Sequence, residues 1–241
     1  MIIIPARIGS SRFPNKVLAD VGGVPMVIRT AQAVSEIDSV AIATDSQEVI
    51  EIAKKHNIEA IITSSTHNSG TDRVFEATQK LGLLDNEVII NVQGDEPFIE
   101  EEVVKAVFDL TVKNRKNKSI MMNSCYKIMS NPEADDPNIV KVVTSNNELA
   151  LYFSRSKIPN PRDHHFNDYK GHLGIYGFTK KSLETFCNLK PAPLEDIEKL
   201  EQLRALYYDY QIAMVKVETK SFGIDTVEDL ENALKLYNIT N

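Results

Sequence analysis

The chain has few cysteines, no long hydrophobic run and no basic leader. Its two cysteines, Cys125 and Cys187, lie far apart without a C-x-x-C or Cys/His ligand spacing, which argues against a disulfide framework and a zinc site. No stretch approaches the ~20 apolar residues that span a bilayer, and the apolar run at the N-terminus is short. We therefore expect a cytoplasmic protein with reduced cysteines and no membrane contact.

Basic residues are also fewer than acidic residues. Twenty-seven Lys and Arg residues against 34 Asp and Glu residues give a formal net charge of -7, which argues against an extended nucleic-acid surface. Any anionic ligand must therefore be met by a local cluster of basic residues. With 42% hydrophobic and 25% charged residues, the 241-residue chain has the composition of one globular domain.

The first half alternates short β-branched runs with longer segments whose apolar residues recur every three or four positions. These patterns predict strands at residues 2–4, 39–43, 59–62 and 87–91. They predict helices at residues 25–35, 46–56, 71–81 and 100–112. Alternating strands and helices indicate βαβ units and a mostly parallel sheet.

The second half changes character, because strands follow one another with little helix between them. We predict strands at residues 119–128, 138–144, 150–154, 171–179 and 212–217. We predict helices at residues 181–188 and 193–207, and a final helix capped by Thr226. The fold class expected is therefore α/β, with a mixed, mostly parallel central sheet flanked by helices and a smaller antiparallel lobe in the second half.

The loop after the first strand, PARIGSSRFPNK, is the first candidate for ligand binding. It combines Gly and Ser amides with Arg7, Arg12 and Lys16, a composition suited to a polyphosphate, although a solvated basic turn would read the same way. Neither G-x-x-x-x-G-K-[ST] nor G-x-G-x-x-G occurs at this junction. A P-loop hydrolase and an NAD-type Rossmann protein are thus disfavoured.

Two acidic positions follow apolar strands. Asp95 lies in NVQGDEP and Asp225 lies in GIDT, immediately before the last predicted helix. Either is compatible with an ordinary surface turn. Together they suggest two carboxylates reaching one magnesium ion, because Mg²⁺ often takes one or two carboxylates and completes its shell with phosphate and water. Spacing alone does not establish that the two meet.

A series of motifs in fixed order covers essentially the whole chain. They are IIPARIGSSRFPNKVL, HNSGTDR, NVQGDEPFI, NIVKVV, LYFSRSKIP, GHLGIYGF, PLEDIEKLEQLR and FGIDTVEDL. In this order they resemble the cytidylyltransferases that activate 3-deoxy-D-manno-octulosonate (Kdo). The resemblance implies a Rossmann-like nucleotide-sugar transferase fold, CTP and Kdo as substrates, Mg²⁺ as cofactor, a homodimer, and a role in lipopolysaccharide biosynthesis.

The resemblance also implies a role for each motif. Arg7 and Lys16 would hold the triphosphate, and Asp95 and Asp225 would bind the metal. The residues implied for the nucleotide are Ala6, Ser11, Gly70, Thr71, Arg73 and Gln93. The residues implied for the sugar are Arg155, His172, Tyr176, Glu201 and Gln202.

The same resemblance divides the single domain into three parts. Residues 1 to about 118 would bind the nucleotide, about 119–218 would bind the sugar and form the dimer, and 219–241 would supply the metal loop and last helix.

Alternatives for single residues stay open: Tyr176 also fits a core strand, and Glu201 with Arg204 fits an ordinary helix pair at i, i+3. His164 and His165 receive no role.

Two rival functions remain at this level. One is the same reaction on another sugar acid, such as sialic acid or an 8-amino Kdo analogue, since one hydroxyl-to-amine change would leave the loops nearly unaltered. The other is a nucleotide-binding protein of the same fold without turnover. The presence of Arg7, Lys16, Asp95 and Asp225 weakens the second rival.

Overall fold

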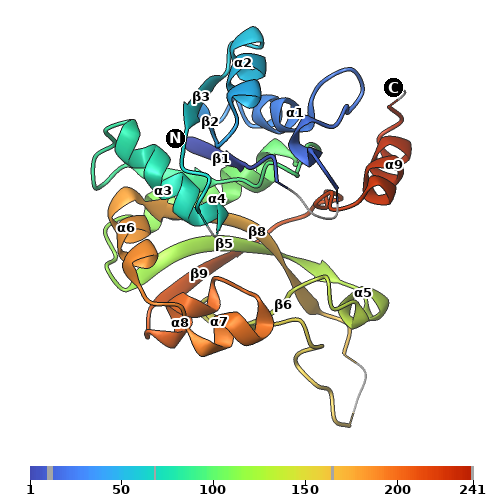
Figure 1. Ribbon diagram of the computed structural model, residues 1–241. Helices are drawn as coiled ribbons and strands as arrows, with labels where there is room; N and C mark the ends of the chain where they lie inside the picture. The colour runs from blue at the N-terminus through green and yellow to red at the C-terminus, as the bar shows by residue number, and fades with distance from the viewer. Residues whose placement is uncertain (10–12, 68, 164–165, 240–241) are drawn as a thin grey trace.

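The computed structural model describes residues 1–9, 13–67, 69–163 and 166–239 (Figure 1). The strands of the first half are β1 (Ile2–Ala6), β2 (Val40–Thr44), β3 (Glu59–Ile62) and β4 (Val88–Asn91). The helices between them are η1 (Lys16–Leu18), α1 (Met26–Ala33), α2 (Gln47–Lys55), α3 (Gly70–Lys80) and α4 (Glu101–Asn114). This half follows the predicted alternation of strand and helix.

The second half is richer in strands. These are β5 (Ile120–Met129), β6 (Lys141–Thr144), β7 (Ala150–Ser154), β8 (Tyr169–Thr179) and β9 (Gln211–Lys216). Its helices are α5 (Asn131–Asp135), α6 (Lys180–Asn188), α7 (Pro193–Glu198), α8 (Leu203–Tyr207) and α9 (Val227–Leu236). None of the helices in the described ranges has the length and apolar character required to cross a membrane.

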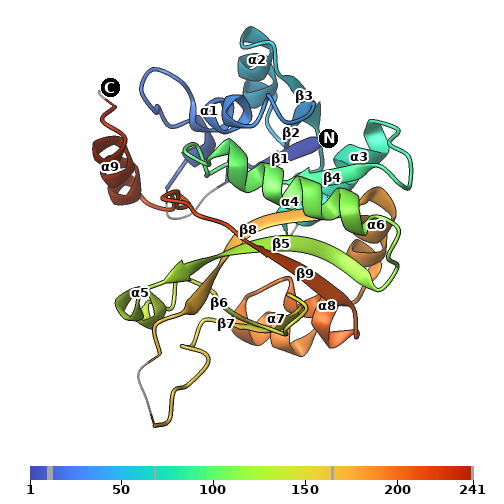
Figure 2. The same ribbon diagram turned by 180° about the vertical axis from the view of Figure 1, so that it is seen from behind.

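The strands pair in the order β3-β2-β1-β4-β8-β5-β9, with β6 attached to β8 and β7 to β6. Strands β1 to β4 are parallel to one another, and β8 joins them antiparallel to β4. Strand β5 is antiparallel to β8 but parallel to β9. The α/β fold class with a mixed sheet and an antiparallel part in the second half is thereby confirmed, and Figures 1 and 2 show the sheet running through both halves.

The core lies on both faces of this sheet, because successive residues of a strand point to opposite sides. Ile2 and Ile4 of β1 pack in one buried cluster, whereas Ile3 packs in another. A third cluster joins Leu230 and Ala233 of α9 to the first half of the chain. The last helix therefore packs against the segment that leads into α1, at the end of the molecule where both views show it (Figures 1 and 2).

Side-chain caps set where several helices begin. The hydroxyls of Ser46, Ser69, Thr179 and Thr226 accept backbone N–H groups at the starts of α2, α3, α6 and α9. Such caps contribute ~1 kcal/mol each, since they satisfy donors that have no partner within the helix. The predicted cap Thr226 is confirmed.

The predicted helix at residues 193–207 is wrong as one element. It is two short helices, α7 and α8, separated at Lys199, which has φ 54° and ends α7 in the left-handed region. Arg204 binds Glu195, with Nε donating to Oε2 at 2.8 Å, so the alternative of a helix pair between Glu201 and Arg204 is not the arrangement found. The break leaves residues 199–202 as a turn.

Two smaller differences concern residues 130–144. Strand β6 begins at Lys141 and not at residue 138, because residues 136–139 form a turn whose carbonyls accept bonds from the Lys141 side chain. Helix α5 was not predicted. Its signal is the capping box of Ser130 and Glu133 with Pro132 in the first turn.

Candidate functional site

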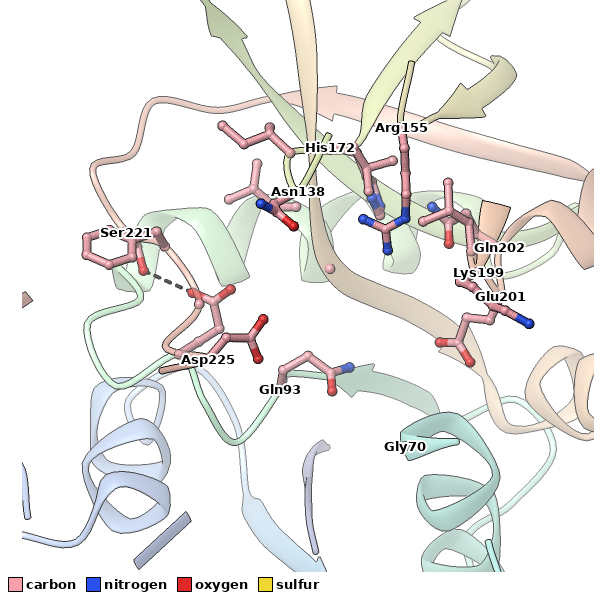
Figure 3. A pocket seen from close by; sticks show the side chains of 18 of the residues that line it. Gly70, Gln93, Asn138, Arg155, His172, Lys199, Glu201, Gln202, Ser221 and Asp225 are labelled. Atoms are coloured by element: carbon pink, nitrogen blue, oxygen red, sulfur yellow. Dashed lines mark hydrogen bonds between the residues drawn. The ribbon is translucent and has the colours of Figure 1, made fainter. Parts of the chain in front are cut away.

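A cleft of about 840 Å³ opens between the loops that follow β4 and the strands and turns of the second half (Figure 3). Parallel strands present their carboxyl ends at one edge of a sheet, which is where ligands bind in such folds. The cleft brings together these predicted site residues: Gly70, Gln93, Arg155, His172, Tyr176, Glu201, Gln202 and Asp225. Positions assigned to the nucleotide and to the sugar therefore share one cavity.

The acidic residues Asp95 and Asp225 meet at the ammonium group of Lys16. Lys16 Nζ lies 2.6 Å from Asp95 Oδ2 and 2.9 Å from Asp225 Oδ1. The backbone joins the same loops, since Ile224 N donates to Asp95 O at 2.9 Å. Burial by itself would lower the pKa of Lys16. The attraction of Asp95 and Asp225 is stronger than this effect, so the pKa of Lys16 lies above its ordinary value. Lys16 is therefore charged at neutral pH.

This arrangement fits a divalent cation. Two carboxylates already converge on one positive charge, and their side chains are 29% and 46% exposed, so they are accessible to a ligand. Carboxylate oxygens are the donors that Mg²⁺ prefers, and a site with two of them leaves room for phosphate oxygens and water. Asp95 and Asp225 could hold such an ion.

A second set of bonds holds the Asp225 loop against the Asp95 loop. Ser221 Oγ donates to Glu96 Oε2 at 3.0 Å, drawn as the dashed line at Ser221 in Figure 3, and Glu100 accepts from Thr219 Oγ1 and Lys220 N. Burial, followed by the Asp95 charge, raises the pKa of Glu96 to about 7. Local sequence holds no signal for these contacts, because the partners are separated by roughly half of the chain.

On the opposite wall, two residues that line the cleft each carry a buried polar atom without a hydrogen-bond partner among the described residues. These atoms are Glu201 Oε2 and Gln202 Nε2. Their companion atoms are engaged: Glu201 Oε1 accepts from Thr71 Oγ1 at 2.6 Å, and Gln202 Oε1 accepts from Tyr176 OH at 3.1 Å. A buried polar atom without a partner is costly, so a ligand that satisfies both atoms would gain affinity.

Arg155 and His172 also line this part of the cleft. Arg155 Nε donates to Glu198 O at 2.9 Å and Nη1 donates to Pro137 O at 3.1 Å, so two backbone carbonyls fix the plane of the guanidinium group. Burial lowers the pKa of His172 to about 3, and its Nε2 lies 3.0 Å from Ser124 Oγ. His172 is therefore a neutral hydrogen-bonding group at neutral pH.

Other predicted site residues, Lys16 and Asp95 among them, do not line the cleft. Arg7 follows β1 directly and is exposed, whereas Ala6 is fully buried as the last residue of β1. Thr71 is 1% exposed and donates to Glu201, which lines the cleft. Ser11 and Arg12 of the basic loop, and His164 and His165, lie outside the described residues.

Arg73 is placed differently from the expected contact with the base. Its side chain is 3% exposed, and its guanidinium group donates to Thr63 Oγ1 at 2.7 Å, Ser64 O at 3.1 Å and Asp45 Oδ2 at 3.0 Å. These bonds use three of the five N–H groups of the guanidinium group, and Arg73 does not line the cleft. The geometry therefore favours a structural role, in which Arg73 holds the segment after β3 against α3.

We expect Arg73→Ala to lower the free energy of unfolding by about 3 kcal/mol, because it leaves the carboxylate of Asp45 without its buried partner. Chemical denaturation measures this change. Arg162→Ala, at a side chain that is 91% exposed, is the control and should alter stability by less than ~0.5 kcal/mol. Unchanged stability together with a weaker preference for CTP would restore the base-reading role of Arg73.

Several cleft residues were not singled out in the sequence. They are Lys127, Asp136, Asn138, Lys199 and Asp229. Lys127 lies on β5, and its Nζ is 3.7 Å from Glu133 Oε1, which leaves the ammonium group near the cleft. No local pattern marks these residues, because each reaches the cavity through the turn or strand pairing of a distant segment.

Comparisons with known proteins identify the family of the chain. The family described as Cytidylyltransferase matches residues 1–217. Proteins named 3-deoxy-manno-octulosonate cytidylyltransferase from Nitratiruptor sp. and Wolinella succinogenes are 58% and 52% identical to the chain. The alignments cover 96% of this chain and 97% of the former protein, and 98% of this chain and 99% of the latter.

Solved structures give the same result. The structure of CMP:2-keto-3-deoxy-manno-octonic acid synthetase complexed with CTP is 35% identical with a TM-score of 0.90, covering 98% of this chain and 97% of that one. A putative glucose-1-phosphate thymidylyltransferase from Bacillus anthracis, at 17% identity and a TM-score of 0.64 over 100% and 96% of the two chains, shares the fold alone. The chain therefore belongs to the 3-deoxy-manno-octulosonate cytidylyltransferase family.

Proposed function

We propose that this protein transfers CMP from CTP to Kdo and releases pyrophosphate. The observation that carries the proposal is a cleft with a cluster of two carboxylates and a lysine at its edge, where Asp225 lines the cavity. Near the carboxyl end of β4, two carboxylates and a lysine suit a metal-bound polyphosphate. On the far wall, a fixed guanidinium group and two buried polar atoms that have no partner among the described residues suit a polyhydroxylated acid. The named relatives support the same pair of substrates.

In the proposed reaction the anomeric hydroxyl of the sugar attacks the α-phosphorus of CTP in line, and pyrophosphate leaves. Lys16, which is charged, would move from the carboxylates to the phosphate oxygens, and Arg7 would add charge beside β1. Mg²⁺ held by Asp95 and Asp225 would supply charge neutralisation at the phosphates. The protein acts mainly by positioning both substrates and stabilising charge in the transition state.

The sugar wall would recognise Kdo through complementary groups. Arg155 presents a planar donor to the sugar carboxylate, a geometry that suits guanidinium–carboxylate pairs. Glu201 Oε2 would accept from one hydroxyl, and Gln202 Nε2 would donate to another. Tyr176 would act through Gln202, because the Tyr176 hydroxyl already donates to Gln202 Oε1. His172, as a neutral ring, would donate or accept one further bond.

Nucleotide choice tests the proposal. Gly70 and Gln93 line the cleft and would face the base. Uracil lacks the amino donor of cytosine and carries a protonated ring nitrogen, and each polar group left unpaired costs ~1–3 kcal/mol. We expect kcat/KM for CTP to exceed that for UTP by at least ~10-fold, with GTP poorer still.

The measurement is pyrophosphate release with CTP, UTP and GTP against Kdo, its 8-amino analogue and sialic acid. Comparable values for the three nucleotides would contradict the assignment of CTP. A faster reaction with another sugar acid would replace Kdo as the substrate. Tight CTP binding without pyrophosphate release from any sugar acid would instead favour a non-catalytic nucleotide-binding protein.

We expect Arg155→Lys to raise KM for the sugar acid by ~10-fold and KM for CTP by less than ~2-fold. A lysine ammonium is a point charge and cannot keep both carbonyl bonds while facing a carboxylate, a loss of ~1.5 kcal/mol. Steady-state kinetics with each substrate varied in turn measures the difference. Arg162→Lys, at an exposed position, is the control, and equal weakening of both substrates would remove Arg155 from the sugar site.

The proposal extends to Mg²⁺ as the cofactor, to a cytoplasmic location and to a homodimer. Leu151 on β7, Ile197 on α7 and Tyr207 on α8 are exposed apolar side chains, and α8 contacts both α7 and β7. Exposed apolar side chains on adjoining elements suit an interface between copies of the chain. Sedimentation equilibrium tests the dimer, since a monomer mass at micromolar concentration would contradict it.

Cell fractionation tests the location, because recovery in the membrane fraction would exclude the cytoplasm.

A further inference from the structure

A chain of hydrogen bonds connects the nucleotide side of the cleft to the sugar side. Gln93 Nε2 donates to Asn91 Oδ1 at 3.3 Å, Asn91 Nδ2 donates to Thr71 Oγ1 at 3.2 Å, and Thr71 Oγ1 donates to Glu201 Oε1 at 2.6 Å. The two central residues are closed to solvent, since Asn91 is 0% and Thr71 is 1% exposed. Each of these three hydrogen bonds is donated in the direction of Glu201.

Each end of this chain lies at a different substrate position. Gln93 stands against the start of α3, where a Cβ placed on Gly70 would lie 3.4 Å from Gln93 Oε1 and 3.1 Å from Pro5 Cγ. A side chain at Gly70 would therefore crowd Gln93. At the other end, Glu201 Oε2 is buried and has no partner within the described ranges. Figure 3 shows Gln93 and Glu201 on facing sides of the cavity.

The three links come from separate parts of the fold. Asn91 is the last residue of β4, Thr71 lies in the first turn of α3, and Glu201 lies in the turn between α7 and α8. The Thr71–Glu201 bond spans 130 residues. It ties the sugar wall to the rigid strand and helix that carry the nucleotide loops. Without this bond, the Glu201 carboxylate would lose the hydrogen bond that fixes Oε1 and, with it, the orientation of the whole carboxylate group.

We propose that Asn91 and Thr71 are positioning residues that couple the two substrate sites, so that CTP and the sugar acid each raise the affinity of the protein for the other. The inference rests on the proposed function. A nucleotide that fixes the Gln93 amide orders Asn91 and Thr71, and these orient the Glu201 carboxylate toward the sugar. Because binding free energies are linked, the sugar must strengthen nucleotide binding by the same factor. Hydrogen bonds in a chain also polarise one another in a buried setting.

Binding without turnover tests the coupling. Calorimetry with a CTP analogue whose α,β-bridge is a methylene group measures the affinity for Kdo with and without the nucleotide. We expect the wild-type protein to bind Kdo at least ~5-fold more tightly when the analogue is present, the lower end of common coupling factors. Thr71→Val, which keeps the shape but lacks the hydroxyl, should reduce this factor to less than ~2-fold.

Three further variants separate coupling from general damage. Thr71→Ser keeps the hydroxyl and should keep the coupling. Asn91→Ser breaks the chain one link earlier and should lower it as Thr71→Val does. Thr78→Val removes another buried hydroxyl from α3, where Thr78 Oγ1 donates to Phe75 O at 2.7 Å, and should leave the coupling unchanged. Thermal unfolding of each variant confirms that the compared proteins are folded.

The outcomes distinguish the coupling from the function itself. Wild-type protein that binds both ligands independently would overturn the coupling and leave the proposed function standing. The coupling through these residues is likewise overturned if Thr71→Val and Asn91→Ser keep the wild-type factor, or if Thr78→Val loses it equally. Wild-type protein that binds neither the CTP analogue nor Kdo would overturn both. A reduced factor in Thr71→Val and Asn91→Ser, restored in Thr71→Ser, supports the coupling.

Discussion

Asp95→Asn and Asp225→Asn are each expected to lower kcat by on the order of 100-fold, the scale seen when a group that stabilises transition-state charge is removed. Both carboxylates converge on Lys16, where they would also hold the metal against the phosphates. Stability should change by no more than ~1 kcal/mol, because both side chains are partly exposed and such pairs contribute little. Pyrophosphate release at saturating and limiting Mg²⁺, together with chemical denaturation, measures both effects.

The matched control is Asp163→Asn, which removes the same charge from a side chain that is 81% exposed. It should leave kcat unchanged. Near wild-type turnover of Asp95→Asn or Asp225→Asn at limiting Mg²⁺ would refute a metal site built on two carboxylates. Loss of turnover accompanied by unfolding would show instead that the carboxylates serve mainly to hold the loops after β4 and β9 together.

Lys16→Met is expected to lower kcat by a similar factor and at the same time to tighten Mg²⁺ binding in the absence of nucleotide. Methionine preserves most of the length of the side chain but removes the charge that would meet the phosphates. In the free protein the ammonium group lies between the two carboxylates that would bind the metal. Its removal leaves two carboxylates near each other, an arrangement that favours a cation.

Calorimetric titration of Mg²⁺ into the nucleotide-free protein measures the second effect, and steady-state kinetics measures the first. Lys118→Met, at an exposed residue outside the cleft, removes one positive charge as a control. Weaker Mg²⁺ binding in Lys16→Met would show that the metal lies elsewhere. Unchanged kcat would remove Lys16 from the phosphate site.

Local sequence patterns predicted most of the elements correctly because local forces form them. The β-branched run at residues 2–4 lies in strand β1, as its pattern indicated, and the residues of β3 and β7 match the predicted bounds. Thr226 begins α9 because its hydroxyl accepts from Asp229 N three residues away. Caps and apolar periodicity act within a few residues, so they can be recognised without knowledge of the fold.

The site was harder to predict, because its parts come from distant segments. Single motifs named Asp95 and Asp225, but no spacing showed that both reach one lysine. The same limitation applies to Arg73, because its motif does not show that its side chain bonds to Asp45, Thr63 and Ser64. A side chain's residue type states which bonds it can form, and only its neighbours determine which bonds it makes.

The sequence by itself determined the α/β class, the order of strands and helices, and the motifs on which the family resemblance depends. The tertiary structure decided that α7 and α8 are separate helices, because Lys199 adopts a left-handed conformation that apolar periodicity does not report. It also decided that Asn91 and Thr71 connect Gln93 to Glu201. Those contacts depend on how strands β4 and β8 pair and how α3 and the α7–α8 turn pack. Such pairings are set by the whole core, and no local stretch of residues encodes them.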